Sequence, residues 1–314
     1  MSGSKNKLKH QPKYQAKNQQ GFTLIELVTV IVILGVLATG ISSFLRFGVQ
    51  SYTHAADRDA LISSARFVVE RLNREVRNAL PNSIRAHGDK NQCLEFVPIV
   101  KSVVYLDIPV APEPARDSVD VLMLDGDTQY VVDTTKYVAV YALDSVDIYN
   151  LDSGVIKALF VKSVTDDPVN TYEKKIIFSN NIDLNEEPPT EIIFNEESPT
   201  ERLYFLGSPV SYCYCIEKQA IYRYQNYDFG PYNSNGTPNS TPDPCNSNGT
   251  PNSTPDPDKV LMAKYVDNYA VDEFPFQTIR ATLQRNGLAL IRLKFARNLE
   301  EIVFNNEIQV PNVP

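Results

Sequence analysis

The stretch GFTLIEL occupies residues 21–27, and an apolar run follows it to about Phe47. The twenty residues before it hold five lysines and no acidic residue, and after Glu26 no charged residue occurs until Arg46. About 20 apolar residues are enough to cross a bilayer as a helix, and a basic flank favours the cytoplasmic side. The sequence therefore predicts a single membrane-spanning helix, with its N-terminus in the cytoplasm and the bulk of the chain outside.

Two details distinguish this segment from an ordinary signal peptide. A signal peptide is cut after its apolar region, whereas the Gly21-Phe22 junction lies before it, so that a cut there keeps the helix. In addition, Glu26 lies near the start of the span, where a carboxylate is costly without a partner. A plain membrane anchor with an incidental glutamate is the alternative reading of this segment.

The basic leader, the GFTLIEL stretch and the apolar helix together resemble the type IV pilins and pseudopilins. This resemblance implies cleavage after Gly21 by a prepilin peptidase, N-methylation of Phe22, and contact between Glu26 and the N-terminal amine of a neighbouring subunit. A buried carboxylate opposite an ammonium group is a reasonable pair, because an unpaired charge would be expensive there. The resemblance to the pilins also implies an α+β, pilin-like fold, in which a long N-terminal helix packs on an antiparallel β-rich globular head.

The charge and the cysteines place further limits on the function. The formal net charge is -8, and removal of a leader with five lysines and no acids gives -8 - 5 = -13. An acidic exterior argues against general nucleic-acid binding, which needs a basic face. The four cysteines, Cys93, Cys213, Cys215 and Cys245, all follow the span, and an even number outside the cytoplasm indicates disulfides.

One long helix is predicted from Phe22 to about Leu80, because Pro81 disfavours helical angles in the residue before it. Its second half is amphipathic. The residues of its apolar face follow a three-four spacing and are Leu61, Ala65, Val68, Leu72, Val76 and Ala79. This face should pack on the protein's own sheet; a coiled-coil seam is the alternative. Glu70 and Arg74 are spaced for an ion pair.

Signals for β-structure dominate from Gln92 onward. The predicted strands are rich in β-branched and aromatic residues and lie within 93–100, 102–110, 117–124, 129–133, 136–143, 154–161, 174–178 and 203–225. Asp125-Gly126 indicates a hairpin turn; Asp125 and Asp127 lack the other ligands of a calcium loop. Asn286-Gly287 indicates a type I′ hairpin turn, and a final strand should close the sheet.

Two polar segments interrupt the predicted head. Residues 181–201 hold the acidic repeats that begin at Asn185 and Asn195, and they are expected to form a surface excursion around a short edge strand; a partner-facing acidic patch is the alternative. Residues 233–257 hold the tandem repeat NSNGTPNSTPDP on both sides of Cys245. Its composition cannot form a packed core, so an exposed loop is predicted.

The cysteines of the predicted strand are two residues apart, so they should point to the same face and not bridge each other. One is expected to pair with Cys93 and the other with Cys245. Cys215–Cys93 with Cys213–Cys245 is the preferred connectivity, and the alternatives remain open. A four-cysteine metal site is the competing idea, but the spacing matches no standard zinc motif. No metal and no cofactor are predicted.

The helix ending RFVVERLNREVRNALPNSIR, the Ser-Tyr-Cys strand and the terminal Pro-Asn-Val-Pro also resemble the MshO group, minor pilins of the mannose-sensitive haemagglutinin (MSHA) pilus that are related to J-type (PilW-like) pseudopilins. This resemblance implies a minor subunit that primes pilus assembly or sits at the tip. The alternatives are a type II secretion pseudopilin, a tip adhesin or ligand-binding module, and a membrane-anchored enzyme. The histidines His10, His54 and His87 accompany no hydrolase, metalloprotease or phosphate-loop motif, so no enzymatic activity is expected.

The predicted organisation has four parts. They are a leader (1–21), a transmembrane or filament-core helix (22–48), an amphipathic helix packing on the head (49–81), and the head itself (82–314) with loop insertions at 181–201 and 233–257. The expected partners are the prepilin peptidase and methylase, other minor and major pilins, the inner-membrane assembly platform and the membrane. The expected location is the inner membrane with a periplasmic head, and then the pilus or cell surface.

Overall fold

The structure is a computed structural model of the chain. It describes residues 21–88, 90–123, 137–149, 158–170, 172–179, 192–227, 229, 245, 258–268, 274–282 and 285–310. The chain divides into two compact units, the first ending at Ala55 and the second beginning at Ala56. The leader before Gly21, the turn at Asp125-Gly126, the strand at 129–133, the repeat from Asn185 and the tandem repeats around Cys245 lie outside the described residues.

Helix α1 runs from Leu24 to Arg77, which confirms the predicted long helix within three residues at each end. It ends before Pro81. There the backbone amides bond to the carbonyl three residues earlier instead of four: Asn78 N donates to Glu75 O and Ala79 N to Val76 O, both at 3.1 Å. The ion pair along the helix joins Arg71 to Glu75 at 2.9 Å; the predicted Glu70–Arg74 pair does not form.

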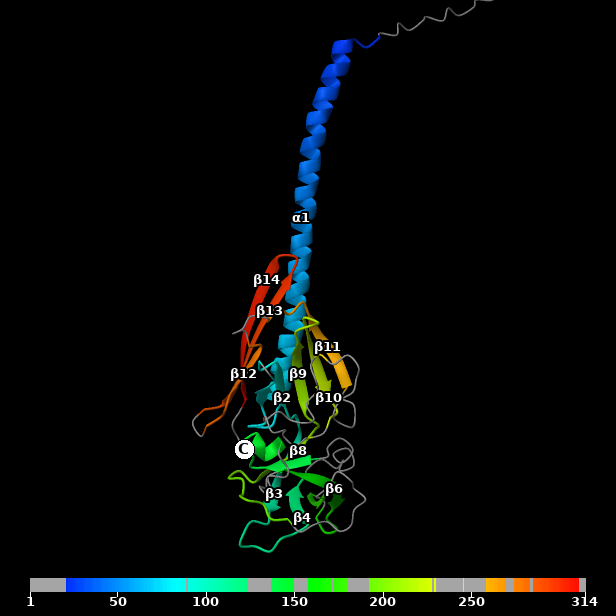
Figure 1. The fold of residues 1–314 in the computed structure, drawn as a ribbon. Coiled ribbons are helices and arrows are strands. Elements are labelled where there is room, and N and C mark those ends of the chain that lie inside the picture. Colours follow the sequence, from blue (N-terminus) through cyan, green and yellow to red (C-terminus); the bar gives the residue numbers. More distant parts are fainter. Residues whose placement is uncertain are drawn as a thin grey trace, which may run out of the picture. The chain divides into compact units, whose positions relative to one another are not determined.

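The apolar face of α1 in the second unit is buried as predicted. The side chains that it contributes to the main core are those of Leu61, Ala65, Val68, Leu72 and Val76, and Ala79 joins them just after the helix. They pack against two antiparallel sheets of the same chain, as Figure 1 shows. The apolar face of α1 therefore packs on sheets of the same chain and does not form a coiled-coil seam.

The first sheet has five strands in the order β1-β2-β9-β10-β11. Their bounds are β1 Arg85–His87, β2 Cys93–Phe96, β9 Val210–Cys215, β10 Ala220–Gln225 and β11 Asp258–Lys264. A turn at 216–219 joins β9 to β10, with Gln219 N donating to Ile216 O at 3.2 Å. Alternate residues of these strands face α1, and the others face away from it.

The second sheet has three strands, β12 (Phe276–Ile279), β13 (Gly287–Arg297) and β14 (Glu300–Val310), which confirms a final closing strand. The predicted type I′ turn at Asn286-Gly287 is wrong. Gly287 opens β13 opposite Val310, and Thr282 forms a β-bridge with Arg285 before it. The type I′ geometry occurs instead at Asn298 and Leu299, whose φ angles are 49° and 70°.

A closed six-stranded antiparallel barrel, β3-β4-β7-β6-β5-β8, forms the rest of the head. Its elements are β3 Ile99–Asp107, β4 Ser118–Leu122, β5 Tyr137–Val140, the short helix α3 Val146–Tyr149, β6 Ala158–Asp166, β7 Glu173–Ser179 and β8 Arg202–Leu206. The barrel is inserted between β2 and β9, which pair directly in the first sheet. The sequence predicts most of these strands but not their closure into a barrel.

Polar and aromatic contacts fix the barrel to the sheet. Tyr149 donates its hydroxyl to Ser83 O at 3.0 Å, and Asn82 Nδ2 donates to Ala142 O at 3.0 Å. The guanidinium of Arg85 lies 3.5 Å from the centroid of the Tyr149 ring. A third apolar cluster, which includes Val97 and Leu206, fills the space beside them. The barrel is therefore docked on the sheet, in addition to being tethered through the two chain crossings.

Candidate functional site

The start of α1 carries the chemistry of the first unit. Thr23 precedes the first helical residue, and its hydroxyl accepts the amide hydrogen of Glu26 at 3.3 Å. In return, Oε2 of Glu26 accepts from the amide and the hydroxyl of Thr23, each at 2.9 Å. This reciprocal arrangement is a capping box, which satisfies backbone donors at a helix N-terminus. The Thr-x-x-Glu spacing indicates a capping box in the sequence, but the box was not predicted.

The capping box orients the Glu26 carboxylate and leaves half of it available. Both contacts with Thr23 use Oε2, and among the described residues Oε1 accepts no hydrogen bond. The free oxygen is an acceptor for a cation supplied by another molecule. The predicted site residue Glu26 is thus held by its own chain in one conformation, in which it can receive an ammonium group at Oε1.

The predicted cleavage site lies just outside the helix. Gly21 and Phe22 precede α1, have no regular secondary structure, and are exposed, with the Phe22 side chain 88% accessible. A peptidase needs an extended, accessible substrate, and this segment offers one. Gly21, Phe22 and Glu26 therefore fall within one short segment.

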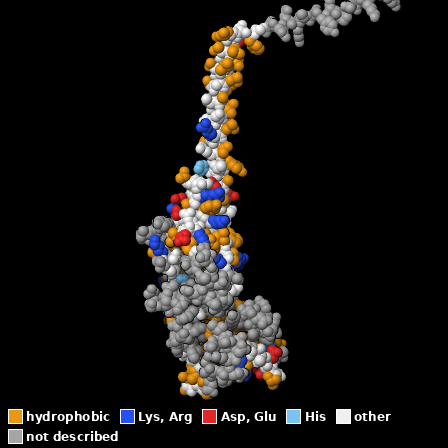
Figure 2. Space-filling view, turned by 45° about the vertical axis from the view of Figure 1, so that its right-hand side comes forward, with side chains coloured by type: hydrophobic (Ala, Val, Ile, Leu, Met, Phe, Trp, Pro, Cys, Tyr) orange, Lys and Arg blue, Asp and Glu red, His pale blue; other side chains and the backbone are white. Residues whose placement is uncertain are grey.

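The helix that follows is apolar on all sides. Within the first unit its large side chains are exposed, and Figure 2 shows hydrophobic side chains along the visible face. The hydroxyls of Thr29 and Thr39 donate to carbonyls of the preceding turn, at 3.0 Å to Ile25 O and 2.8 Å to Val36 O, so they place no unsatisfied polar group on the surface. A helix of this length and composition fits a membrane span, because lipid replaces water around it.

The four cysteines form two disulfides, Cys93–Cys213 and Cys215–Cys245. One strand cysteine therefore pairs with Cys93 and the other with Cys245, as expected, but the preferred connectivity is wrong. The register of the sheet explains the difference: β2 pairs with β9 so that Cys93 lies directly opposite Cys213. Cys215 lies two residues farther along β9, beyond the end of β2, and is left for Cys245.

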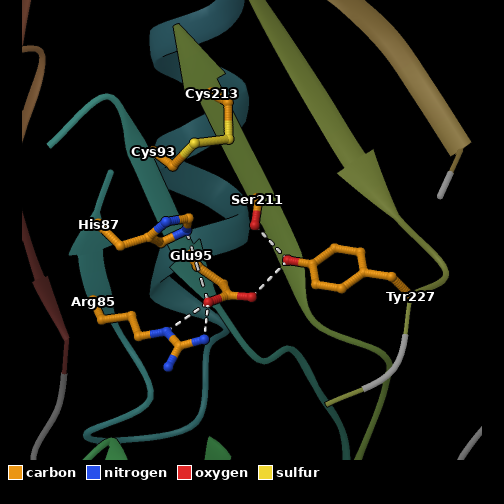
Figure 3. Close-up of a disulfide and its surroundings, with 7 residues drawn as sticks. All are labelled: Arg85, His87, Cys93, Glu95, Ser211, Cys213 and Tyr227. Carbon is orange, nitrogen blue, oxygen red and sulfur yellow. Dashed lines mark hydrogen bonds and ion pairs between the residues drawn. A yellow bond between two sulfur atoms is a disulfide. The ribbon is translucent and has the colours of Figure 1, made fainter. Parts of the chain in front are cut away.

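Beside the first disulfide, the sheet buries a cluster of polar side chains on the face away from α1 (Figure 3). Glu95, which is almost fully buried, accepts from Nε and Nη2 of Arg85, both at 2.5 Å, and from the hydroxyl of Tyr227 at 2.8 Å. The Tyr227 hydroxyl also bonds to that of Ser211. In the sequence, this cluster is indicated only by Glu95, a glutamate within the apolar run CLEFVPIV, and it was not predicted.

His87 completes the cluster. It pairs with Cys93 across β1 and β2, and its Nε2 atom is buried and makes no hydrogen bond. Burial lowers the pKa of His87 to about 4, outweighing the nearby Glu95 charge, which raises it. Burial and the Glu95 charge raise the pKa of Tyr227. The cluster therefore holds a neutral imidazole and a neutral phenol around one Arg–Glu ion pair.

The described residues contain no group of three or more histidine, cysteine, aspartate or glutamate side chains placed to hold a metal ion. The disulfides use all four cysteines, so no thiolate remains in them for a metal. The cluster around Glu95 is enclosed and internally satisfied apart from His87 Nε2. Its hydrogen bonds and ion pair link β1, β2 and β9 to the segment after β10.

Comparison with known proteins supports one motif. The prokaryotic N-terminal methylation motif matches residues 16–42. No curated protein and no solved structure matches the chain. The motif indicates a type IV pilin-like or pseudopilin protein, and it implies processing by a prepilin peptidase in the context of pilus assembly. The match covers the capping box and most of the apolar helix.

Proposed function

We propose that the chain is a minor pilin that is cut between Gly21 and Phe22, methylated at Phe22, and used in the initiation or at the tip of an MSHA-type type IV pilus. The observation that carries this proposal is the Thr23–Glu26 capping box, which presents a carboxylate oxygen at the head of an apolar helix. The N-terminal methylation motif around these residues supports the same assignment. The resemblance to the MshO group supplies the choice of pilus.

The proposed work of the protein is assembly, without a reaction of its own. Once the leader is removed, Phe22 carries the N-terminal amine four residues before Glu26. The Oε1 atom of Glu26 would accept from the amine of an adjacent subunit while Oε2 stays in the capping box. Pairing the two charges lowers the cost of holding the carboxylate in an apolar surrounding, and it sets the axial register between helices.

The proposed topology places the N-terminus in the cytoplasm and the head in the periplasm. Five lysines before Gly21 favour the cytoplasmic side. Two disulfides in the second unit fit an oxidising compartment. The prepilin peptidase, other minor and major pilins and the inner-membrane assembly platform are the partners that follow from this location.

The inserted barrel favours a place at the tip over a place in the shaft. It adds residues 99–206 to the sheet-and-helix part of the head, and a tip subunit needs no neighbour stacked above it. A type II secretion pseudopilin is the second candidate, because the same N-terminal segment serves both systems. An adhesive role of the barrel would add to the tip position and would leave filament numbers normal when its surface is altered.

Intact-mass and N-terminal peptide analysis of the protein purified from membranes of its host tests this proposal. A chain that begins at Phe22 with one added methyl group is the expected result. A chain that keeps Met1, or one cut after the apolar run, would overturn it. Deletion of the gene, scored for surface pili and for secretion, then separates the pilus from the secretion system.

A further inference from the structure

One side of α1 in the second unit is left open by the two sheets. A groove of about 1000 Å³ lies there. It is lined by residues of α1 between Glu70 and Arg77, by Asn306 and Glu307 of β14, and by the apolar side chains of Phe96, Pro98 and Val210. Asn306 Nδ2 donates to Asn73 Oδ1 at 3.1 Å, which fixes β14 beside the helix. One border of the groove is thus formed by Asn306 and Glu307 of β14.

That strand, β14, has a free edge. It is eleven residues long, and among the described strands it pairs only with β13, without a bulge. The type I′ turn directs the amide of Glu300 toward β13, and the alternation of an antiparallel ladder then directs every second residue outward. The outward residues are Glu301, Val303, Asn305, Glu307 and Gln309. Their backbone groups make no hydrogen bond in the described part of the chain.

The charges on the floor of the groove are only partly satisfied. Burial opposes ionisation of Glu75, but hydrogen bonds from Arg71 and Arg223 outweigh it and lower the pKa of Glu75. In contrast, Arg74 and Arg77 on α1 are exposed and make no ion pair with the described residues; the same holds for Glu70, one turn before Arg74, and for Glu307 on β14. A strand added to β14 would lie over Arg74 and Arg77, so carboxylates on the inner face of that strand would form ion pairs with them.

We propose that the groove between α1 and β14 binds an extended segment of a neighbouring filament subunit, which adds to the free edge of β14 and places acidic side chains on Arg74 and Arg77. Strand addition gives affinity through main-chain hydrogen bonds and specificity through alternate side chains. The outer face of the added strand lies beside the exposed Val303, which favours β-branched side chains there.

A second copy of this chain fits the groove less well than a different subunit. Two β14 edges paired about residue 304 would place Glu301 of each copy opposite Glu307 of the other, and like charges across a ladder are unfavourable. The identification of the partner as a filament subunit rests on the proposed function. The groove itself does not depend on it, so the two proposals can fail separately.

The test uses the full chain purified in detergent and two fluorescent peptides, Thr-Glu-Val-Glu-Val-Glu-Thr and Thr-Lys-Val-Lys-Val-Lys-Thr. Fluorescence anisotropy should show at least tenfold tighter binding of the glutamate peptide. Arg74→Glu with Arg77→Glu should reverse this preference. Arg66→Glu is the matched control, because Arg66 is exposed on the same helix outside the groove, and it should leave the preference unchanged.

A backbone variant tests strand addition independently of charge. In Asn305→Pro the lost amide points outward, so the ladder with β13 keeps its hydrogen bonds while the edge loses a donor. Binding of the glutamate peptide should fall at least tenfold. Equal binding of both peptides by the wild-type chain, an unchanged preference in the double arginine variant, or full binding by a folded Asn305→Pro chain would each overturn the proposal.

Discussion

The Nε2 atom of His87 lies 3.9 Å from Oε2 of Glu95, a carboxylate already paired with Arg85. Because burial lowers the pKa of His87 to about 4, the folded chain resists a proton that the unfolded chain accepts near pH 6.5. Stability should therefore be full above pH 6.5 and be lost as the pH falls toward 4. The loss should reach about 3 kcal/mol, at about 1.4 kcal/mol per pH unit.

Urea unfolding of the full chain between pH 7.5 and 5 measures this effect, since most carboxylates titrate below that window. His87→Gln is the control, because it keeps a polar side chain of similar reach but does not titrate. The variant should be less stable at neutral pH and should show a flatter profile. An equally steep profile in the variant would show that another group carries the pH dependence.

The disulfide between Cys93 and Cys213 lies where the chain enters and leaves the barrel. It joins the strand that enters the barrel to the strand that leaves it, across a sequence separation of 120 residues, whereas Cys215–Cys245 spans 30. Removing a native disulfide typically costs about 2–5 kcal/mol, and the entropic model makes the longer loop worth about 1 kcal/mol more. Replacement of Cys93 and Cys213 by alanine should therefore cost more than replacement of Cys215 and Cys245.

Denaturant unfolding of the two double variants under identical conditions gives the comparison. Both should keep the helix and strand content of the parent by circular dichroism, which controls for misfolding. An equal loss of stability in the two variants, or a larger loss in the variant without Cys215–Cys245, would contradict the greater contribution of the Cys93–Cys213 disulfide.

The sequence predicted the local elements of this protein better than their connections. The spacing of Leu61, Val68 and Leu72 indicated the buried face of α1, because helical periodicity depends only on neighbouring residues. The barrel could not be predicted in that way, since closure depends on which strands pair. The same limit explains the wrong disulfide connectivity: the pairing of Cys93 with Cys213 is set by the register of β2 and β9.

The candidate site divides along the same line. Gly21, Phe22 and Glu26 form a contiguous motif that the sequence reveals directly, and the capping partner Thr23 was within reach of the same reasoning. The cluster around Glu95 combines residues from β1, β2, β9 and the segment after β10. No spacing rule links such distant positions, so only the fold could bring them together.

Glu26→Leu should leave cleavage after Gly21 largely intact but lower pilus assembly, because the peptidase acts on the exposed segment before α1 and the carboxylate acts between subunits. Glu26→Gln should keep the contacts with Thr23 and still lower assembly, since the charge is lost. Immunoblots of sheared surface filaments, with mass analysis of the membrane fraction, measure both steps. Normal pilus number in Glu26→Leu would refute the proposed role of the carboxylate.

The turn between β13 and β14 contacts Asp57 of α1. Arg297 Nε lies 3.1 Å from Asp57 Oδ1, and Asn298 Nδ2 donates to Asp57 Oδ2 at 2.8 Å, so the turn is fixed to α1. The next residue, Leu299, has a φ of 70° and a side chain that is 97% exposed. A leucine in this conformation costs about 1–2 kcal/mol, and its exposed side chain provides no burial in return.

Leu299→Gly should consequently stabilise the chain by about 0.5–1 kcal/mol, because the relief of strain exceeds the extra freedom that glycine gives the unfolded chain. Leu299→Ala is the matched control: it removes the exposed side chain but keeps the Cβ atom, so it should bring no gain. A shift of the urea midpoint at constant slope measures the difference. A loss of stability in Leu299→Gly would mean that the leucine side chain contributes a contact that outweighs the strain of its backbone.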